Sequence, residues 1–166
     1  DEVDSPNDDL RFKAIEKGAV IFSRAEGMWY GSPDTVGESS IYWACTNGGQ
    51  NQMGQIFRYF PNEDPEKGGE LELFLEPNDS ELLTHADNIT IAPSGELFIC
   101  EDTKGTNHIR GVTKGGDMFT LARNAFNGSE FAGACFSPDG STLFVNLQSP
   151  GITVAITGPF LGGTGS

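Results

Sequence analysis

The stretch that decides the fold is EFAGACFSPDGSTLFVNLQ, residues 130–148. Its first half is an apolar run, Phe131 to Phe136, which reaches the four-residue turn SPDG. A second apolar run, Leu143 to Leu147, follows the turn. The proline presets its backbone for the second position of a β-turn, and the glycine tolerates the backbone of a tight reversal. Two short β-rich runs around such a turn predict an antiparallel hairpin.

The same phrase occurs earlier in the chain, as ITIAPSGELFICED at 89–102 and more loosely as SSIYWACTNGG at 39–49. Leu97 and Leu143 hold equivalent places in two hairpins and lie 46 residues apart. A repeat of roughly 40–50 residues that is built from short strands is typical of β-propeller blades. The sequence therefore predicts an all-β fold, a β-propeller with about three four-stranded blades. Further strands are expected at 39–46, 54–60, 70–75, 109–112, 117–122 and 152–156, and a first apolar alternation runs from 12 to 22.

We expect residues 1–166 to form one partial propeller domain, with an exposed acidic segment at 1–11 and a small-residue tail at 161–166. Propellers close with roughly four to eight blades, so an array of about three leaves two bare edges. This shortfall predicts either that the chain is part of a longer one or that a partner supplies the other half of the propeller. We favour the first of these two interpretations.

The charge balance excludes one class of partner. The chain of 166 residues carries 24 acidic and 10 basic side chains, a formal net charge of −14. Nucleic acid is excluded, because its phosphates would be repelled. The charge suits a protein that binds cations, or one selected to stay dissolved in salty surroundings. No apolar run of 18 residues and no signal peptide is present, so the sequence predicts no transmembrane segment.

The cysteines are expected to be structural. Cys45, Cys100 and Cys135 each lie inside an apolar β-run, where a free thiol behaves as a small buried hydrophobic group. A disulfide or a metal thiolate is the alternative. No CxxC spacing is present, so the sequence gives no support to a zinc site.

Polar side chains recur where the innermost strand of each unit begins. In a propeller these strand entrances converge on one mouth of the central channel, where carboxylate and carboxamide oxygens would offer the hard ligands that Ca²⁺ and Fe³⁺ prefer. An arginine there would grip a phosphate through two parallel hydrogen bonds. The alternative is that these residues only cap strands and turns. The residues are Arg24 and Glu26, Asp87 and Asn88, Asn124 and Glu130, with Glu101 and Asp102 at the far end of a hairpin strand.

Four phrases resemble the C-terminal half of the PhoX-type alkaline phosphatases. They are FSRAEGMWYG at 22–31, GQIFRY at 54–59, ADNITIAPSGELFICED at 86–102 and EFAGACFSPDGSTLFVNLQSPGITVAITGPF at 130–160. The resemblance implies a six-bladed propeller in an exported bacterial phosphomonoesterase that uses Ca²⁺ and iron. It also implies a periplasmic or extracellular location and phosphate esters as substrates.

The resemblance further implies roles for individual residues. Arg24 would be the catalytic arginine at the substrate phosphate, and Glu26 would bind a metal. Further metal positions at the channel mouth would be Asp87, Asn88, Glu101 and Asp102. From their place at a strand entrance, Glu130 is expected as a metal position as well, and Asn124 beside the substrate. The family's N-terminal half brings a metal-binding cysteine, onto which none of the three cysteines here can be mapped. We therefore expect this stretch alone to be inactive, although the intact parent would be an enzyme.

Two other functions fit the same residues. Six-bladed lactonases and esterases hold Ca²⁺ with Glu, Asn and Asp at the channel mouth. Arg24 argues against them, because a neutral lactone has little use for a guanidinium. The third possibility is a non-catalytic propeller that serves as a scaffold or subunit, and metal content would separate it from both enzymes.

Overall fold

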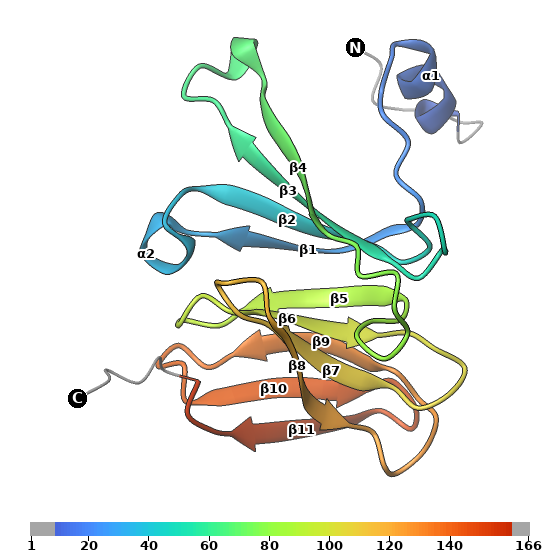
Figure 1. Cartoon of the computed structure of the whole chain (residues 1–166), viewed down its shortest axis with the longest axis vertical. Helices are drawn as coiled ribbons and strands as arrows, with labels where there is room; N and C mark the ends of the chain where they lie inside the picture. The colour runs from blue at the N-terminus through green and yellow to red at the C-terminus, as the bar shows by residue number, and fades with distance from the viewer. Residues whose placement is uncertain (1–8, 161–166) are drawn as a thin grey trace.

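The computed structural model describes residues 9–160, and three antiparallel β-sheets dominate it (Figure 1). The predicted tail at 161–166 and most of the predicted acidic segment at 1–11 lie outside the described residues. The all-β prediction is confirmed. No helix among residues 9–160 is long and apolar enough to cross a membrane.

The first sheet is a four-stranded meander in which each strand pairs with the next along the chain. A short helix, α2 (Pro33–Val36), joins the first two strands, and a single 3₁₀ turn, η1 (Pro65–Lys67), joins the last two. The strands are β1 (Ala25–Gly31), β2 (Ser40–Cys45), β3 (Gln55–Pro61) and β4 (Gly69–Leu75).

The second and third sheets repeat this plan. The predicted hairpins lie where the sequence placed them, and the turn SPDG joins β9 to β10. The third sheet has three strands among the described residues, one fewer than predicted. The second sheet contains β5 (Ala86–Ile91), β6 (Leu97–Glu101), β7 (His108–Val112) and β8 (Met118–Arg123), and the third contains β9 (Phe131–Phe136), β10 (Thr142–Leu147) and β11 (Ile152–Thr157).

The apolar alternation at 12–22 does not form a strand. Residues Leu10–Glu16 form the helix α1, none of whose residues is buried. The sequence LRFKAIE consists mostly of good helix formers. Within residues 9–160 no strand pairs with this segment, so local helix propensity decides its structure (Figure 1).

The three sheets stack face to face, with their first strands β1, β5 and β9 side by side (Figure 1). One hydrophobic cluster lies between the first and second sheets and includes Ile56 and Ile99. Another lies between the second and third and includes Phe98 and Leu143. Burial of each such side chain stabilises the stack by about 1.5–3 kcal/mol. The described sheets form an open stack, so closure into a propeller stays a prediction.

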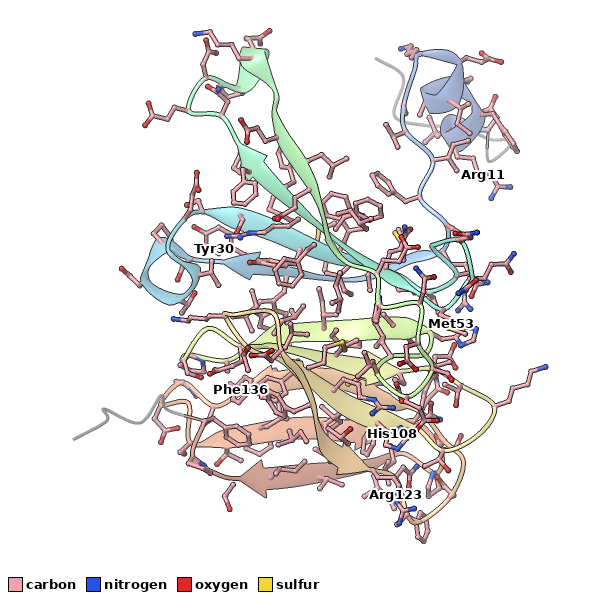
Figure 2. All side chains as sticks on the ribbon, in the orientation of Figure 1. Arg11, Tyr30, Met53, His108, Arg123 and Phe136 are labelled. Carbon is pink, nitrogen blue, oxygen red and sulfur yellow. The ribbon has the colours of Figure 1, made fainter. Side chains whose placement is uncertain are left out.

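The two outer faces of the stack are uncovered within residues 9–160. Phe98, in the middle sheet, is 3% exposed, whereas Phe144, which holds the equivalent place in the third sheet, is 39% exposed. On the first sheet, Met28 and Tyr30 are likewise exposed (Figure 2). Cys45 and Cys100 are buried as predicted, but the prediction is wrong for Cys135, which is exposed. The reason is that Cys135 lies opposite Phe144 on the uncovered face.

Candidate metal centre

Irregular pairing marks the entrance of two innermost strands. The register between β1 and β2 shifts between Ala25 and Met28, and that between β5 and β6 shifts between Ala86 and Ile89. Such a bulge bends the strand and re-aims its side chains, and bulges are frequent next to active sites. The shifted segments contain Glu26 in β1 and Asp87 with Asn88 in β5.

The backbone just before each bulge is strained. Arg24 has φ of 50° and His85 has φ of 52°, and each lies two residues before the acid of its strand. A non-glycine residue in this left-handed region costs about 1–3 kcal/mol and persists only where its surroundings impose it. Here Thr46 N–H donates to the carbonyl of Arg24 at 2.9 Å, and Asp102 N–H donates to the carbonyl of His85 at 3.0 Å.

Three carboxylates meet at this end of the sheets. Asp87, Asp102 and Glu130 each contribute one oxygen, and these oxygens lie within 4.8 Å of one another. Asp87 lies in β5, Asp102 directly follows β6, and Glu130 directly precedes β9. We call these three residues the acidic triad. The sequence predicted each of them as a metal position, and the structure brings them together.

Burial and crowding raise the pKa values of two of the three carboxylates, Glu130 and Asp87. The pKa of Glu130 is raised to about 7, first by burial and then by the charges of Asp102 and Asp87. The pKa of Asp87 is also raised, first by burial and then by Glu26 and Asp102, while Arg24 opposes the shift. Both shifts have the same cause, which is unbalanced negative charge at a partly buried point.

One guanidinium borders the triad. Arg24 Nη2 lies 3.5 Å from Asp102 Oδ2 and 3.5 Å from Glu26 Oε1. The Arg24 side chain is 46% exposed, so these long ion pairs contribute at most about 1 kcal/mol each. The guanidinium is therefore only loosely held, and its outer face is open to an anion.

The two carboxamide side chains predicted at the site, Asn88 and Asn124, form hydrogen bonds with the backbone. Asn88 Oδ1 accepts a hydrogen bond from the Ala134 N–H at 2.8 Å, which joins β5 to β9. Asn124 is buried, and its side chain bonds the loop that follows β8, donating to the Ser129 carbonyl at 2.7 Å and accepting from the Phe126 N–H at 3.0 Å. The turn-capping interpretation describes Asn124, whereas Asn88 links two sheets rather than capping a turn.

Glu101 lies outside the triad although Asp102 is its neighbour in the chain. Its carboxylate is 1% exposed and pairs with Arg110 Nε at 2.9 Å and His108 Nδ1 at 2.8 Å. Neither partner was among the residues predicted from the sequence. The signal was Arg110 inside the apolar strand HIRGV, because a buried arginine requires a carboxylate near it.

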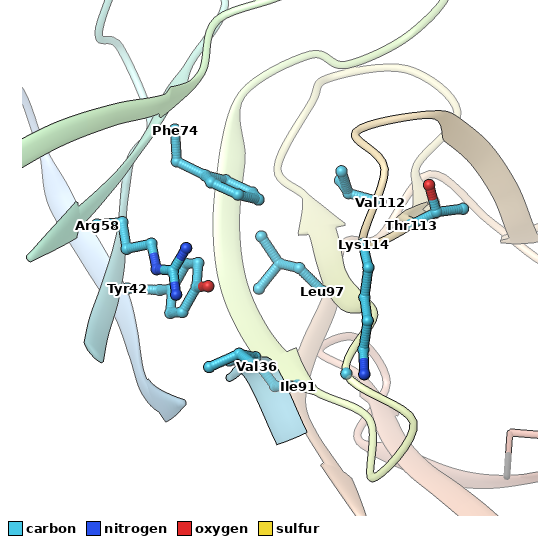
Figure 3. Close-up of a pocket in the computed structure, with 10 residues that line it drawn as sticks. Val36, Tyr42, Arg58, Phe74, Ile91, Leu97, Val112, Thr113 and Lys114 are labelled. Carbon is cyan, nitrogen blue, oxygen red and sulfur yellow. The ribbon is translucent and has the colours of Figure 1, made fainter. Parts of the chain in front are cut away.

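A cavity among residues 9–160 lies away from the triad. It has a volume of about 100 Å³ and lies between the first two sheets, near the ends of β5 and β7 rather than near the start of β5 (Figure 3). Its charged lining residues are Arg58 and Lys114, both cationic, and the remaining lining is mainly apolar. A cavity with this lining offers no ligand for a cation, so the triad is the candidate metal centre.

The triad has the right donors and dimensions for a hard cation. Ca²⁺ takes oxygen ligands at about 2.3–2.6 Å, so two ligands of one ion lie at most about 4.6–5.2 Å apart. The 4.8 Å spread of the three oxygens falls in that range. A bound cation would also relieve the repulsion that raises the pKa values of Asp87 and Glu130. Carboxylates suit Fe³⁺ by the same hardness argument.

Comparison with known proteins agrees with these features. The sequence model of the family described as Alkaline phosphatase PhoX matches residues 2–151. A search of curated proteins found no match, and neither did a search of solved structures. The matched range spans most of the chain and contains the whole triad and Arg24. The family predicted from the sequence phrases is confirmed, and a phosphatase-type function follows at the level of the family. The chain belongs to the PhoX alkaline phosphatase family.

Proposed function

We propose that this chain carries the cation site and the phosphate-binding arginine of a metal-dependent phosphomonoesterase. The observation that carries the proposal is the acidic triad, whose oxygens lie within 4.8 Å of one another, with Arg24 3.5 Å from one member. Carboxylates that gather a cation beside a loosely held guanidinium suit phosphoryl transfer, where position and charge do most of the catalysis. The family match supports the same reaction class.

The ions proposed are Ca²⁺ at the triad and Fe³⁺ as a second hard cation at the same mouth. Asp87, Asp102 and Glu130 would hold the Ca²⁺, and Glu26 would add a fourth carboxylate from β1. When bound, such ions act as Lewis acids that withdraw charge from phosphoryl oxygens. The proposed ligand set excludes Asn88 and Glu101, whose oxygens are already engaged in hydrogen bonds.

Arg24 has the substrate role in this proposal. Its guanidinium would hold two phosphate oxygens through parallel N–H···O bonds and stabilise the charge that spreads over them. Asn124 is left out of the substrate site, because the loop after β8 uses its donors and its acceptor. A neutral lactone would gain little from the guanidinium, so the phosphatase interpretation is favoured over the lactonase.

The uncovered outer faces of the first and third sheets support the proposal that the complete assembly contains more sheets. We propose that further sheets cover the outer faces of the first and third sheets and complete a six-bladed propeller. The exposure of Phe144, against the burial of its equivalent Phe98, supports this proposal. The further sheets would come from the same chain or another one and would bring additional ligands. By family, a periplasmic or extracellular location is proposed.

Metal content and catalysis test the proposal together. The complete protein, with the further sheets that the proposal requires, is to be analysed for calcium and iron, titrated with Ca²⁺ by calorimetry, and assayed with an aryl phosphate monoester. Asp87→Asn is expected to weaken Ca²⁺ binding strongly, because it removes one of the four carboxylate charges proposed for the site. Arg24→Ala is expected to lower turnover by about a hundredfold or more and to leave the calcium content unchanged.

Arg123→Ala is the matched control for Arg24. Arg123 ends β8, is exposed and pairs with His108 in β7, a strand that carries no triad member, so its replacement should change neither turnover nor calcium content. If Arg24→Ala hydrolyses the ester as fast as Arg123→Ala does, Arg24 does not bind the phosphate. If the unmodified protein binds no Ca²⁺ or Fe³⁺, the metal site is wrong and the non-catalytic scaffold becomes the better interpretation.

A further inference from the structure

Glu101 is the most heavily bonded carboxylate among the described residues. Its Oε1 accepts hydrogen bonds from Thr84 N–H at 3.0 Å and from Arg110 Nε at 2.9 Å. Its Oε2 accepts from His108 N–H at 3.1 Å and lies 2.8 Å from His108 Nδ1. A buried carboxylate with this many donors is held in one position.

The donors come from two separate parts of the chain. Thr84 precedes β5, the strand that carries Asp87, whereas His108 and Arg110 lie in β7. The residue after Thr84, His85, is held by a backbone hydrogen bond from its N–H to the Met53 carbonyl at 2.6 Å. Figure 2 shows His108 and Met53 at the same end of the sheets. Glu101 thus fastens the segment before Asp87 to a strand on the far side of β6.

These contacts also hold the backbone segments that carry two triad members, Asp87 and Asp102. Asp102 directly follows Glu101, and its N–H donates to the carbonyl of His85 at 3.0 Å. Ala86, the residue before Asp87, is the pairing partner of Glu101 itself. The backbones that carry Asp87 and Asp102 are therefore joined by one backbone hydrogen bond and one buried side chain.

Charge separates the role of Glu101 from that of the triad. Arg110 neutralises Glu101 at 2.9 Å and donates its Nη1 to Thr120 Oγ1 at 2.6 Å. Arg110 thus balances the negative charge of Glu101 within the second sheet. The unbalanced charge remains with the triad, where it favours a cation.

We infer that Glu101 is a positioning residue for the candidate metal centre, holding Asp87 and Asp102 at the spacing that a cation requires while binding no metal itself. The inference rests on the proposed function, since it assumes that the triad binds Ca²⁺. Partners that orient metal ligands commonly change metal affinity about 10–100-fold when removed.

The test uses Ca²⁺ alone as the probe and compares three variants of the purified protein. Glu101→Gln replaces one acceptor oxygen by an NH₂ donor, and Glu101→Asp keeps the charge on a shorter stem. Thr120→Val is the control, because it removes a hydrogen bond from the same network without touching the segments that carry the triad. Calorimetry measures Ca²⁺ affinity, and hydrogen exchange of peptides covering 82–88 measures order in metal-free protein.

Glu101→Gln is expected to weaken Ca²⁺ binding about tenfold or more and to speed exchange at 82–88, whereas Thr120→Val changes neither. If Glu101→Gln does not fold, Glu101→Asp is expected to show a smaller weakening and the same faster exchange. Unchanged affinity and unchanged exchange in a folded Glu101 variant would overturn the inference. If unmodified protein binds no Ca²⁺, the proposed function fails by itself, and unchanged exchange at 82–88 would still refute the positioning role.

Discussion

Replacing Gly27 by alanine tests how closely the first two sheets approach beside the metal centre. Gly27 lies in the bulged segment of β1, one residue after Glu26. Its φ is not in the left-handed region, so alanine is allowed by the backbone itself. Any effect of Gly27→Ala must therefore come from packing.

The magnitude follows from the contacts of an added Cβ. That atom would lie 2.5 Å from the Asp87 carbonyl oxygen and 2.8 Å from both Asn88 Cα and Ile89 N. Ordinary contacts begin near 3.4 Å, so β1 and β5 must separate by about 0.9 Å at this point. The obstructing atoms are backbone and cannot rotate away. Overpacking of this kind costs about 1–3 kcal/mol.

Thermal unfolding and calcium titration measure the effect. For a protein of about this size, 1 kcal/mol corresponds to roughly 2–4 °C, so Gly27→Ala should lower the Tm by about 2–12 °C. Ca²⁺ affinity should fall as well, because the displaced backbone carries Asp87. Gly115→Ala is the control, since its Cβ would meet only ordinary contacts at 3.7 and 3.8 Å. Equal Tm values for Gly27→Ala, Gly115→Ala and the unmodified protein would refute the direct packing of β1 on the β5 backbone.

Two further predictions concern protons and thiols. Because the pKa of Glu130 is raised from 4.5 to about 7 in the folded state, metal-free protein should lose stability as pH rises from about 4.5 to 7, as denaturation in a chelator at several pH values can show. Ca²⁺ must displace that proton, so its affinity should rise with pH below 7 by at most about tenfold per pH unit and level off above; a flat profile would contradict the crowding of the triad. A thiol reagent should modify Cys135 quickly in the isolated 166-residue chain and leave Cys45 and Cys100 unmodified until denaturant is added, since those two are buried. Equal rates for all three thiols would disprove the stack, and protection of Cys135 in a longer form would show that its face is covered.

The strands could be predicted because their signals are local. The hairpin from β9 to β10 rests on a turn whose proline and glycine act within four residues. The helix α1 was missed for the same reason, because a short apolar alternation resembles a strand when no pairing partner is known. The exposure of Cys135 was missed because a sequence does not say which outer face has a neighbour.

Candidate residues for the site could be predicted from the sequence, but which of them lie close together could not. Of the eight polar candidates, six at strand entrances and two at the end of a hairpin strand, only Asp87, Asp102 and Glu130 form the triad, with Arg24 beside it. Of the other candidates, Asn124 caps its own loop, as the alternative interpretation allowed, and Asn88 bonds the backbone of the third sheet. Nothing in their spacing distinguishes a ligand from a cap, because both uses need the same side chains.

By itself, the sequence determined the family, the all-β class and the hairpins, since turn chemistry and a period of two act over a few residues. Only the tertiary structure decided which of the neighbours Glu101 and Asp102 joins the triad. Successive side chains near a strand end point to opposite sides, so Glu101 enters the second sheet to meet Arg110 while Asp102 joins the triad. The pairing of β5 with β6 places Asp87 near Asp102, and only the stacking of the third sheet on the second adds Glu130, so that the three oxygens lie within 4.8 Å of one another.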